Sequence, residues 1–236
     1  MYNLKMKFSK GLIKGKLIKR YKRFFIDIKL NKEIVTAHCP NTGSMKGLLD
    51  EDNEVFISRN DDPKRKLKYT LEIIKVKKNL VGVNTYFANK IAYHGLSNNL
   101  VKEVSNIDNI KPEVFFDKET RFDFFIKKKN QKIFLEVKNV TLFRDEKIAE
   151  FPDTITTRGS KHLKTLIIAT KNGYKSYLLF LIQIQGIKSF KIARDLDEEY
   201  YKNYLVAKKA GVKFLAYRCK INDKEIRIEK KIKIIN

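Results

Sequence analysis

Two acidic side chains and one lysine have the types and the spacing needed for phosphodiester hydrolysis. Asp123 lies in the β-prone run 121–126, and Glu136 and Lys138 lie in the next such run, 132–140. Successive side chains of a strand point to opposite faces, so Glu136 and Lys138 share one face. If the two runs form a hairpin, Asp123 comes beside Glu136. The sequence therefore predicts two carboxylates and one ammonium group on one face of a sheet.

This set of groups can hydrolyse a phosphodiester. Two carboxylates and water hold Mg²⁺ or Mn²⁺, and the metal stabilises the charge that builds on phosphorus. The lysine orients the attacking water or neutralises the pentavalent phosphorus. An aspartate followed by Glu-X-Lys on the next strand is the signature of the restriction-endonuclease-like nuclease fold. The alternative is a surface salt bridge between Glu136 and Lys138, but the hairpin with Asp123 favours a metal site.

Other residues extend this predicted site. Glu103 is a candidate third carboxylate for the metal, and the alternative is an exposed glutamate at the end of a helix. Arg158, Lys161 and His162 open a predicted helix, and helix N-termini attract phosphate. For His162 the alternative is a structural or surface histidine.

The first part of the chain predicts a small β-barrel. Short β-prone runs, some with period-two alternation, occupy residues 12–20, 23–30, 33–38, 54–58 and 69–77. Five short strands of this length favour the five-stranded oligonucleotide-binding (OB) barrel, and the alternative is another small barrel without a ligand. The loop at 40–47 holds two glycines, two hydroxyls and a lysine, so Asn41, Thr42, Ser44 and Lys46 are candidate phosphate ligands. An ordinary turn is the alternative for this loop.

The rest of the chain predicts an α/β domain, with a domain boundary near residue 83. Helical periodicity marks 83–100, with a second short helix at 98–105, and then 158–172 and 197–210. Predicted strands are 121–126, 132–140, 177–183, 212–217 and 226–235, of which the continuous apolar run 177–183 reads as a buried central strand. The prediction is a barrel at 1–83 and an α/β domain with a mixed sheet at 84–236.

The composition favours a polyanionic partner. The 236 residues carry a formal net charge of +24, and neutralised phosphates release condensed counterions. A lysine-rich nucleotide bias, a ribosomal partner or a membrane surface would also explain the charge. Neither an apolar run of about 18 residues nor a secretory leader is visible. The two cysteines have no metal-ligand spacing, so reduced thiols in the cytoplasm are expected.

Several longer motifs resemble the sugar fermentation stimulation protein A family in the family's order. They are Ala37–Leu49, Val81–Thr85 with Ala88-Asn89, Arg121–Phe124, Glu136–Leu142, Phe151–Asp153 and Arg158–Leu163. The resemblance covers about residues 8 to 220. It implies an OB-like barrel, a restriction-endonuclease-like PD-(D/E)xK domain, and DNA binding without strong sequence preference. It also implies a regulatory role in sugar, notably maltose, catabolism, which the residues themselves do not show.

Residue by residue, the resemblance places Asp123, Glu136 and Lys138 at the nuclease positions and Glu103 at the preceding acidic position. Lys102 stands where the family pattern has arginine, and Cys39 stands inside the first loop motif. The resemblance also favours function for the loop at 40–47 and for the segment 158–162.

The predicted function is a metal-dependent deoxyribonuclease acting on single-stranded or duplex DNA. Its catalytic residues are Asp123, Glu136 and Lys138, and its metal ligands are Asp123, Glu136 and Glu103. The predicted nucleic-acid contacts are Arg23, Asn41, Thr42, Ser44, Lys46, Arg121, Arg158, Lys161 and His162. One alternative is a DNA-binding regulatory protein that keeps the nuclease fold without turnover, and another is an RNA or ribosome partner. Symmetric dimers are common among enzymes that cut both strands, so a homodimer is a further expectation.

Overall fold

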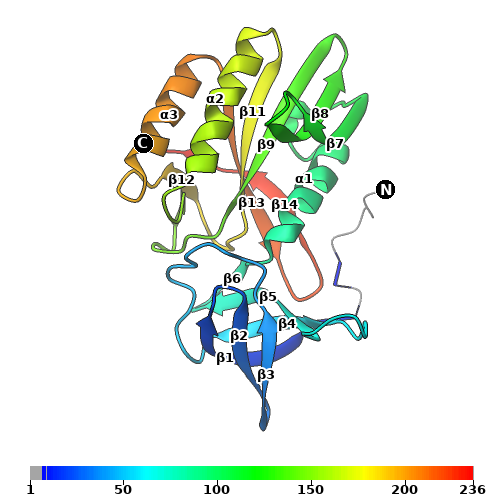
Figure 1. The fold of residues 1–236 in the computed structure, drawn as a ribbon, viewed down its shortest axis with the longest axis vertical. Coiled ribbons are helices and arrows are strands. Elements are labelled where there is room, and N and C mark those ends of the chain that lie inside the picture. The colour runs from blue at the N-terminus through cyan, green and yellow to red at the C-terminus, as the bar shows by residue number, and fades with distance from the viewer. Residues whose placement is uncertain (1–6, 9, 236) are drawn as a thin grey trace.

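The computed structural model describes residues 7, 8 and 10–235 and shows a small all-β part beneath a larger α/β part (Figure 1). The chain passes from one to the other between β6 (Asn79–Gly82) and α1 (Ala88–Ser97). A single 3-10 turn, η1 (Thr85–Phe87), precedes α1, and Asn84 caps this turn by accepting the N–H of Tyr86. The helix predicted from residue 83 therefore begins later.

The N-terminal part is a closed five-stranded barrel of the OB type, as predicted. Its strands are β1 (Ile13–Tyr21), β2 (Phe25–Leu30), β3 (Glu33–His38), β4 (Glu54–Arg59) and β5 (Tyr69–Val76). The order β3-β2-β1-β4-β5 closes through a parallel pairing of β3 with β5. The unpredicted strand β6 lengthens this sheet beside β5.

The C-terminal part is built on a six-stranded mixed sheet, which confirms the predicted fold class. From edge to edge its strands are β14 (Ile226–Lys231), β13 (Lys213–Ile221), β11 (Lys175–Ile182), β9 (Gln131–Val140), β8 (Arg121–Lys128) and β7 (Asn109–Phe115). The strand β11 is parallel to both of its neighbours, β9 and β13. At the edges the pairings are antiparallel: β14 with β13, β8 with β9, and β7 with β8. The apolar run predicted as a central strand is β11.

Helices cover both faces of this sheet (Figure 1). The helices α2 (Thr157–Lys171) and α3 (Glu198–Lys209) share a core with the side chains of Phe134 and Phe180. The helix α1 packs on the other face, against Leu135 and Leu179. The second predicted short helix is only a 3-10 turn, η2 (Lys102–Val104). The last predicted strand, 226–235, is divided into β14 and a short strand β15 (Lys233–Ile234), and two further short strands were not predicted: β10 (Ile148–Phe151) and β12 (Ser189–Ile192).

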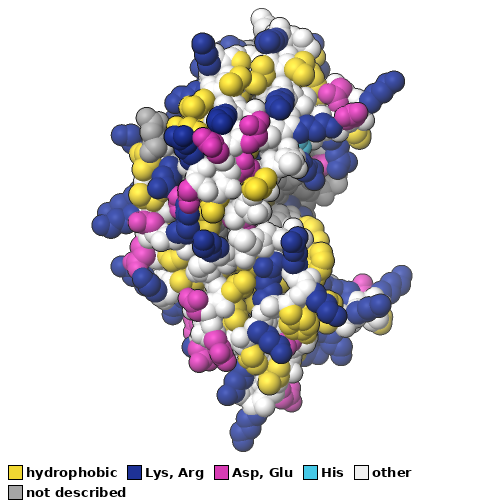
Figure 2. Space-filling model, turned by 60° about the vertical axis from the view of Figure 1, so that its left-hand side comes forward, with side chains coloured by type: hydrophobic (Ala, Val, Ile, Leu, Met, Phe, Trp, Pro, Cys, Tyr) yellow, Lys and Arg dark blue, Asp and Glu magenta, His cyan; other side chains and the backbone are white. Residues whose placement is uncertain are grey.

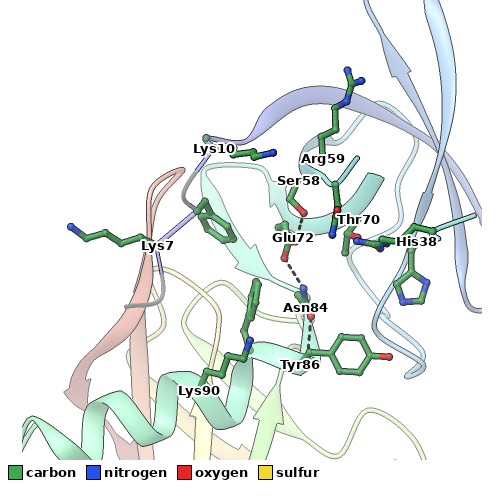
Figure 3. Close-up of a pocket in the computed structure, with 15 residues that line it drawn as sticks. Lys7, Lys10, His38, Ser58, Arg59, Thr70, Glu72, Asn84, Tyr86 and Lys90 are labelled. Atoms are coloured by element: carbon green, nitrogen blue, oxygen red, sulfur yellow. Dashed lines mark hydrogen bonds between the residues drawn. The ribbon is translucent and has the colours of Figure 1, made fainter. Parts of the chain in front are cut away.

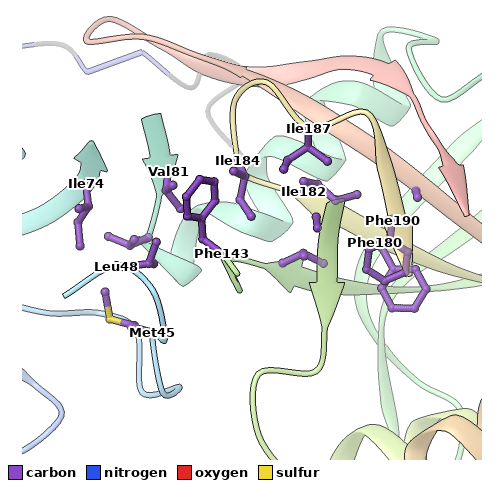
Figure 4. Packing of buried hydrophobic residues seen from close by; sticks show 14 of the residues in the cluster. Met45, Leu48, Ile74, Val81, Phe143, Phe180, Ile182, Ile184, Ile187 and Phe190 are labelled. Carbon is purple, nitrogen blue, oxygen red and sulfur yellow. The ribbon is translucent and has the colours of Figure 1, made fainter. Parts of the chain in front are cut away.

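One apolar core runs from the barrel into the α/β part (Figure 4). Met45 and Leu48 of the barrel loop belong to the same buried cluster as Val81 of β6 and as Phe143 and Ile184 of the α/β part. Each of these side chains is at most 7% exposed. Burial of this much apolar surface holds the two parts together.

The surface is basic on both parts. Figure 2 shows lysine and arginine spread from one end of the molecule to the other, with acidic side chains in small groups between them and a hollow at the waist. Within the described part of the chain, none of the helices combines the length and the apolar character that crossing a bilayer requires.

Candidate active site

The hairpin of β8 and β9 brings the three predicted catalytic residues together. Phe124 pairs with Leu135, so the next position on β8 is Asp123 and the next on β9 is Glu136. Asp123 Oδ2 accepts the backbone N–H of Val137 at 2.7 Å. The side chains of β9 alternate as expected: Val137, between Glu136 and Lys138, lies in the core under α1.

Glu136 is the most buried carboxylate of this group, at 3% exposure. Its Oε1 accepts the Lys138 ammonium at 2.8 Å and contacts Nδ1 of His162. Its Oε2 has no hydrogen-bond partner among the described residues. Burial alone would raise the pKa of Glu136, but the neighbouring Lys138 and His162 outweigh it and hold the pKa below its ordinary value.

Asp123 has the opposite electrostatic balance. Burial, and then the charge of Glu136, raise its pKa to about 7. Hydrogen bonds from the N–H of Val137 and from the amide of Asn89 lower this pKa but do not offset the rise. A carboxylate pair with pKa values moved in opposite directions is a recurrent feature of functional sites.

A third carboxylate, Glu113 of β7, lies at this site and was missed by the sequence interpretation. The Asn89 amide of α1 donates to Asp123 Oδ1 at 2.7 Å and to Glu113 Oε1 at 3.2 Å. Glu113 also pairs with Arg121 at 2.9 Å. Its φ of 56° and the skipped pairing between Pro112 and Val114 mark an irregularity of β7 at this residue. The signal was an acidic residue one strand before Asp123, but 109–115 was not recognised as a strand.

Glu103 does not join this group. Its carboxylate accepts the Tyr217 hydroxyl at 2.7 Å and pairs with Lys231 at 2.6 Å. These partners belong to β13 and β14, which are the second and third strands from β9 in the sheet. At the usual spacing of strands they lie about 10 Å or more from β9. Its pKa is lowered, because hydrogen bonds from Lys231 and Tyr217 outweigh the effect of burial. The prediction of Glu103 as a ligand to the same metal as Asp123 and Glu136 does not agree with this placement.

The donor set fits a hard divalent cation that takes its remaining ligands from water and phosphate. Among residues 7, 8 and 10–235, no group of three Asp, Glu, His or Cys side chains is arranged to enclose a metal by itself. Glu136 Oε2 is nevertheless a buried oxygen without a hydrogen-bond partner among the described residues, and it could serve as a ligand to such a cation. Asp123 adds a second carboxylate, and Mg²⁺ sites commonly use one or two carboxylates.

The predicted phosphate loop at 40–47 packs instead against the α/β part. Asn41 is 4% exposed; its side-chain oxygen accepts the N–H of Gly43 and its side-chain nitrogen donates to the Thr141 hydroxyl. Ser44 donates its hydroxyl to the backbone of Asp153 at 3.0 Å. The prediction that Asn41 contacts nucleic acid is therefore replaced by an internal structural role. Thr42 and Lys46 remain exposed.

Arg20, which the sequence interpretation did not select, orders this loop. Its guanidinium donates to the carbonyls of Asn41 at 2.7 Å, Gly43 at 3.0 Å and Arg23 at 3.0 Å. Arg23 itself lies in the turn between β1 and β2 with an exposed side chain.

The remaining predicted contacts lie around the carboxylates. His162 is buried at the start of α2, where its Nδ1 is 3.2 Å from Lys138 Nζ, and Arg158 donates to its other nitrogen at 3.4 Å. Lys161 pairs with Glu119 at 2.7 Å on the surface. The structure therefore brings His162 to Glu136 and leaves Lys161 exposed.

The fold and the site together define a two-domain protein, an OB barrel joined to a mixed-sheet domain with an acidic centre. Residues 18–83 match the family model described as the SfsA N-terminal OB domain, and residues 86–225 match the sugar fermentation stimulation protein RE domain. The chain therefore belongs to the sugar fermentation stimulation protein family.

Relatives match over nearly the whole chain. A sugar fermentation stimulation protein homolog of Pelagibacter ubique (strain HTCC1062) is 80% identical over 231 residues, which cover 98% of this chain and 100% of the relative. The homolog of Pseudoalteromonas atlantica is 41% identical, with 98% and 100% covered. A solved structure of Pyrococcus furiosus SfsA, in complex with Ca²⁺, superposes with a TM-score of 0.88 at 21% identity, covering 98% of this chain and 99% of that one.

Proposed function

We propose that the chain binds DNA and hydrolyses its phosphodiester bonds with the help of a divalent metal ion. The observation that carries the proposal is the pair Asp123 and Glu136 beside Lys138, in which Glu136 Oε2 is buried without a partner. Two carboxylates within a strongly basic protein attract a cation to the place that a phosphate must reach.

Each residue of the site has a separate part in this proposal. Asp123 and Glu136 would hold Mg²⁺ or Mn²⁺, which neutralises the charge that builds on the phosphate. Lys138, which lies 2.8 Å from Glu136, would donate to the attacking water or to a phosphate oxygen. Asn89 holds the Asp123 carboxylate in place through its amide.

The comparisons support a divalent metal without naming it. The Pyrococcus furiosus relative was solved in complex with Ca²⁺. Ca²⁺ and Mg²⁺ are both hard cations that take oxygen ligands, and Mg²⁺ needs the stricter geometry. Support for DNA as the substrate comes from the OB domain and from the net charge of +24.

The test is cleavage of labelled single-stranded, duplex and branched DNA with Mg²⁺, with Mn²⁺ and with EDTA. We expect cleavage with a metal and none with EDTA. The cleavage rate should fall at least about 100-fold in Glu136→Gln and in Asp123→Asn, because changes even to the residues that surround metal ligands cost up to that amount. DNA affinity of both variants in EDTA should be equal or higher, because each loses a negative charge near the phosphate. Undiminished cleavage by either variant would remove that residue from the metal site.

A second function is favoured by how tightly Glu136 is enclosed. It is 3% exposed and held by Lys138 and His162, so a metal reaches it only when these side chains move. A protein that binds DNA without turnover, in a regulatory role in sugar catabolism, agrees with this closure. Binding of DNA with no cleavage under any metal is the outcome that selects it.

A further inference from the structure

A groove at the seam between the barrel and the α/β part lies outside the acidic centre described above (Figure 3). Its volume is about 690 Å³. Its walls come from the barrel strands β3 to β5 with the loop at 59–65, from residues 84–90, and from four residues near the N-terminus: Lys7, Phe8, Lys10 and Gly11. No predicted site residue lines it.

Five basic side chains surround this seam groove. They are Lys7, Lys10, Arg59, Arg65 and Lys90. Arg59 is paired with Asp61 at 2.7 Å. Within the described residues, the other four make no ion pair with a carboxylate. Such cations bind a phosphate backbone without regard to sequence.

Aromatic rings stand among these cations. Tyr86 is 68% exposed, although its backbone is fixed by the Asn84 side chain. Phe8 and Phe87 contact each other edge to face with their centroids 6.0 Å apart. An exposed ring on a fixed backbone beside cations is a stacking platform for an unpaired base.

The floor of the groove is polar. Glu72 is 3% exposed, and its two oxygens accept the Ser58 hydroxyl at 2.6 Å and the Asn84 amide at 2.7 Å. A carboxylate has about four acceptor positions, so each oxygen keeps one that is unused by these bonds. Figure 3 shows Glu72 between the barrel strand and the start of α1, with Tyr86 to one side.

We propose that this seam groove holds one nucleotide of a single-stranded nucleic acid. The base stacks on Tyr86, its amino edge donates to Glu72, and Lys10, Arg65 and Lys90 take the flanking phosphates. Guanine, adenine and cytosine carry such an amino group, whereas thymine has only its ring N3–H as a donor, between two carbonyl oxygens that the carboxylate repels. The seam groove therefore favours the first three bases over thymine. This inference rests on the proposed function, whose DNA substrate it makes more specific.

The first turn of α1 connects the groove to the candidate active site. Lys90 faces the groove, whereas its neighbour Asn89 donates to Asp123 and Glu113. Adjacent residues of a helix point about 100° apart, so one turn of α1 presents a side chain to each place. A strand with a base in the groove is therefore held one residue of α1 away from the side chain that bonds Asp123.

The test is the affinity of fluorescent single-stranded oligonucleotides for the full chain in EDTA at pH 8, where the Glu72 carboxyl is ionised, measured by anisotropy. We expect oligo(dC) and oligo(dA) to bind more tightly than oligo(dT). Tyr86→Ala should weaken oligo(dC) binding roughly 5- to 150-fold, the range for one stacked base. Tyr86→Phe should keep the affinity, because the ring face remains. Glu72→Gln should bring the dC-to-dT ratio close to one, since an amide also donates to thymine carbonyls.

Tyr201→Ala, on α3, is the matched control and should bind like the parent. Parent-like binding of oligo(dC) by Tyr86→Ala overturns the proposal, and so does an unchanged base preference in Glu72→Gln. Free dCMP that binds as tightly as the oligonucleotide also overturns the assignment to a strand. Thermal melts of each variant ensure that folded protein is compared.

This result is separable from the nuclease proposal. If no metal supports cleavage, the base preference in EDTA is still measured. If the groove is irrelevant, Tyr86→Ala loses neither affinity nor metal-dependent cleavage, whereas Glu136→Gln loses cleavage alone.

Discussion

Asp123 and Glu136 are neighbours whose pKa values move in opposite directions. The difference comes from their partners: Glu136 has Lys138 and His162, while Asp123 has a backbone N–H and the Asn89 amide. A divalent cation between them would favour the ionised form of both. If the centre takes up a metal at neutral pH, as proposed, Asp123 should lose a proton on binding.

The third carboxylate of the centre can be identified by comparing two glutamates. Glu113→Gln should lower metal-dependent cleavage about 10- to 100-fold, because Glu113 shares the Asn89 amide with Asp123 and groups of this kind tune metal sites by that amount. Glu103→Gln is the matched control and should leave the rate unchanged. Initial rates at saturating DNA, with metal titrations, measure both. Equal losses in the two variants would contradict the assignment.

Glu72 predicts a pH dependence of stability. Burial, against hydrogen bonds from Ser58 and Asn84, raises its pKa from 4.5 to about 7. Below about pH 4.5 the carboxyl is protonated in both the folded and the unfolded chain, so it does not change the free energy of unfolding. Between these pH values the unfolded chain ionises first, so stability falls as pH rises and stays lowered above pH 7.

Glu72→Gln should remove this loss. Its melting temperature should rise relative to the parent from pH 5 to pH 8, equivalent to at most on the order of 3 kcal/mol. Thermal unfolding at four pH values measures the difference. Glu54→Gln, on the neighbouring strand, is the control and should follow the parent. Parallel curves for Glu72→Gln and the parent would show that the buried carboxyl is ionised in the fold.

Among the elements, the loop between β3 and β4 determines how the two parts meet. Gly47 has a φ of +80°, and a methyl group there would overlap the carbonyl oxygen of Phe143. Gly47→Ala should therefore lower the free energy of unfolding by roughly 1–3 kcal/mol or more, and melt several degrees earlier. Gly173→Ala is the control, because Gly173 has a similar φ of +84° and open space around it. Equal losses would assign the effect to φ alone.

The sequence predicted the elements with strong periodicity and missed the short or irregular ones. The β8–β9 hairpin and β11 follow from alternation and from a continuous apolar run, so local patterns were enough to place Asp123 beside Glu136, and Glu136 beside Lys138. The strand β7 was not predicted, because Pro112 and the irregularity at Glu113 interrupt its alternating pattern. Glu103 was misplaced because its position depends on contacts with β13 and β14, which local patterns do not encode.

Across the whole molecule, the sequence predicted the amount of positive charge but not where a groove would collect it. The net charge of +24 covers both parts (Figure 2). The seam groove is assembled from His38, residues 58–72, residues 84–90, and four residues near the N-terminus (Lys7, Phe8, Lys10 and Gly11), which only the closed fold brings together. Sites of this kind need the tertiary arrangement, whereas a hairpin site needs only neighbouring strands.

The shared apolar core has a consequence for synthesis of the chain. The barrel leaves the ribosome first, and Met45, Leu48 and Val81 then lack their partners Phe143 and Ile184. About 100 further residues separate the end of the barrel from Ile184, which takes roughly 5–20 s at ordinary translation rates. During that interval these three apolar side chains of the nascent barrel are exposed to solvent. A chaperone that binds apolar segments of nascent chains would bind there.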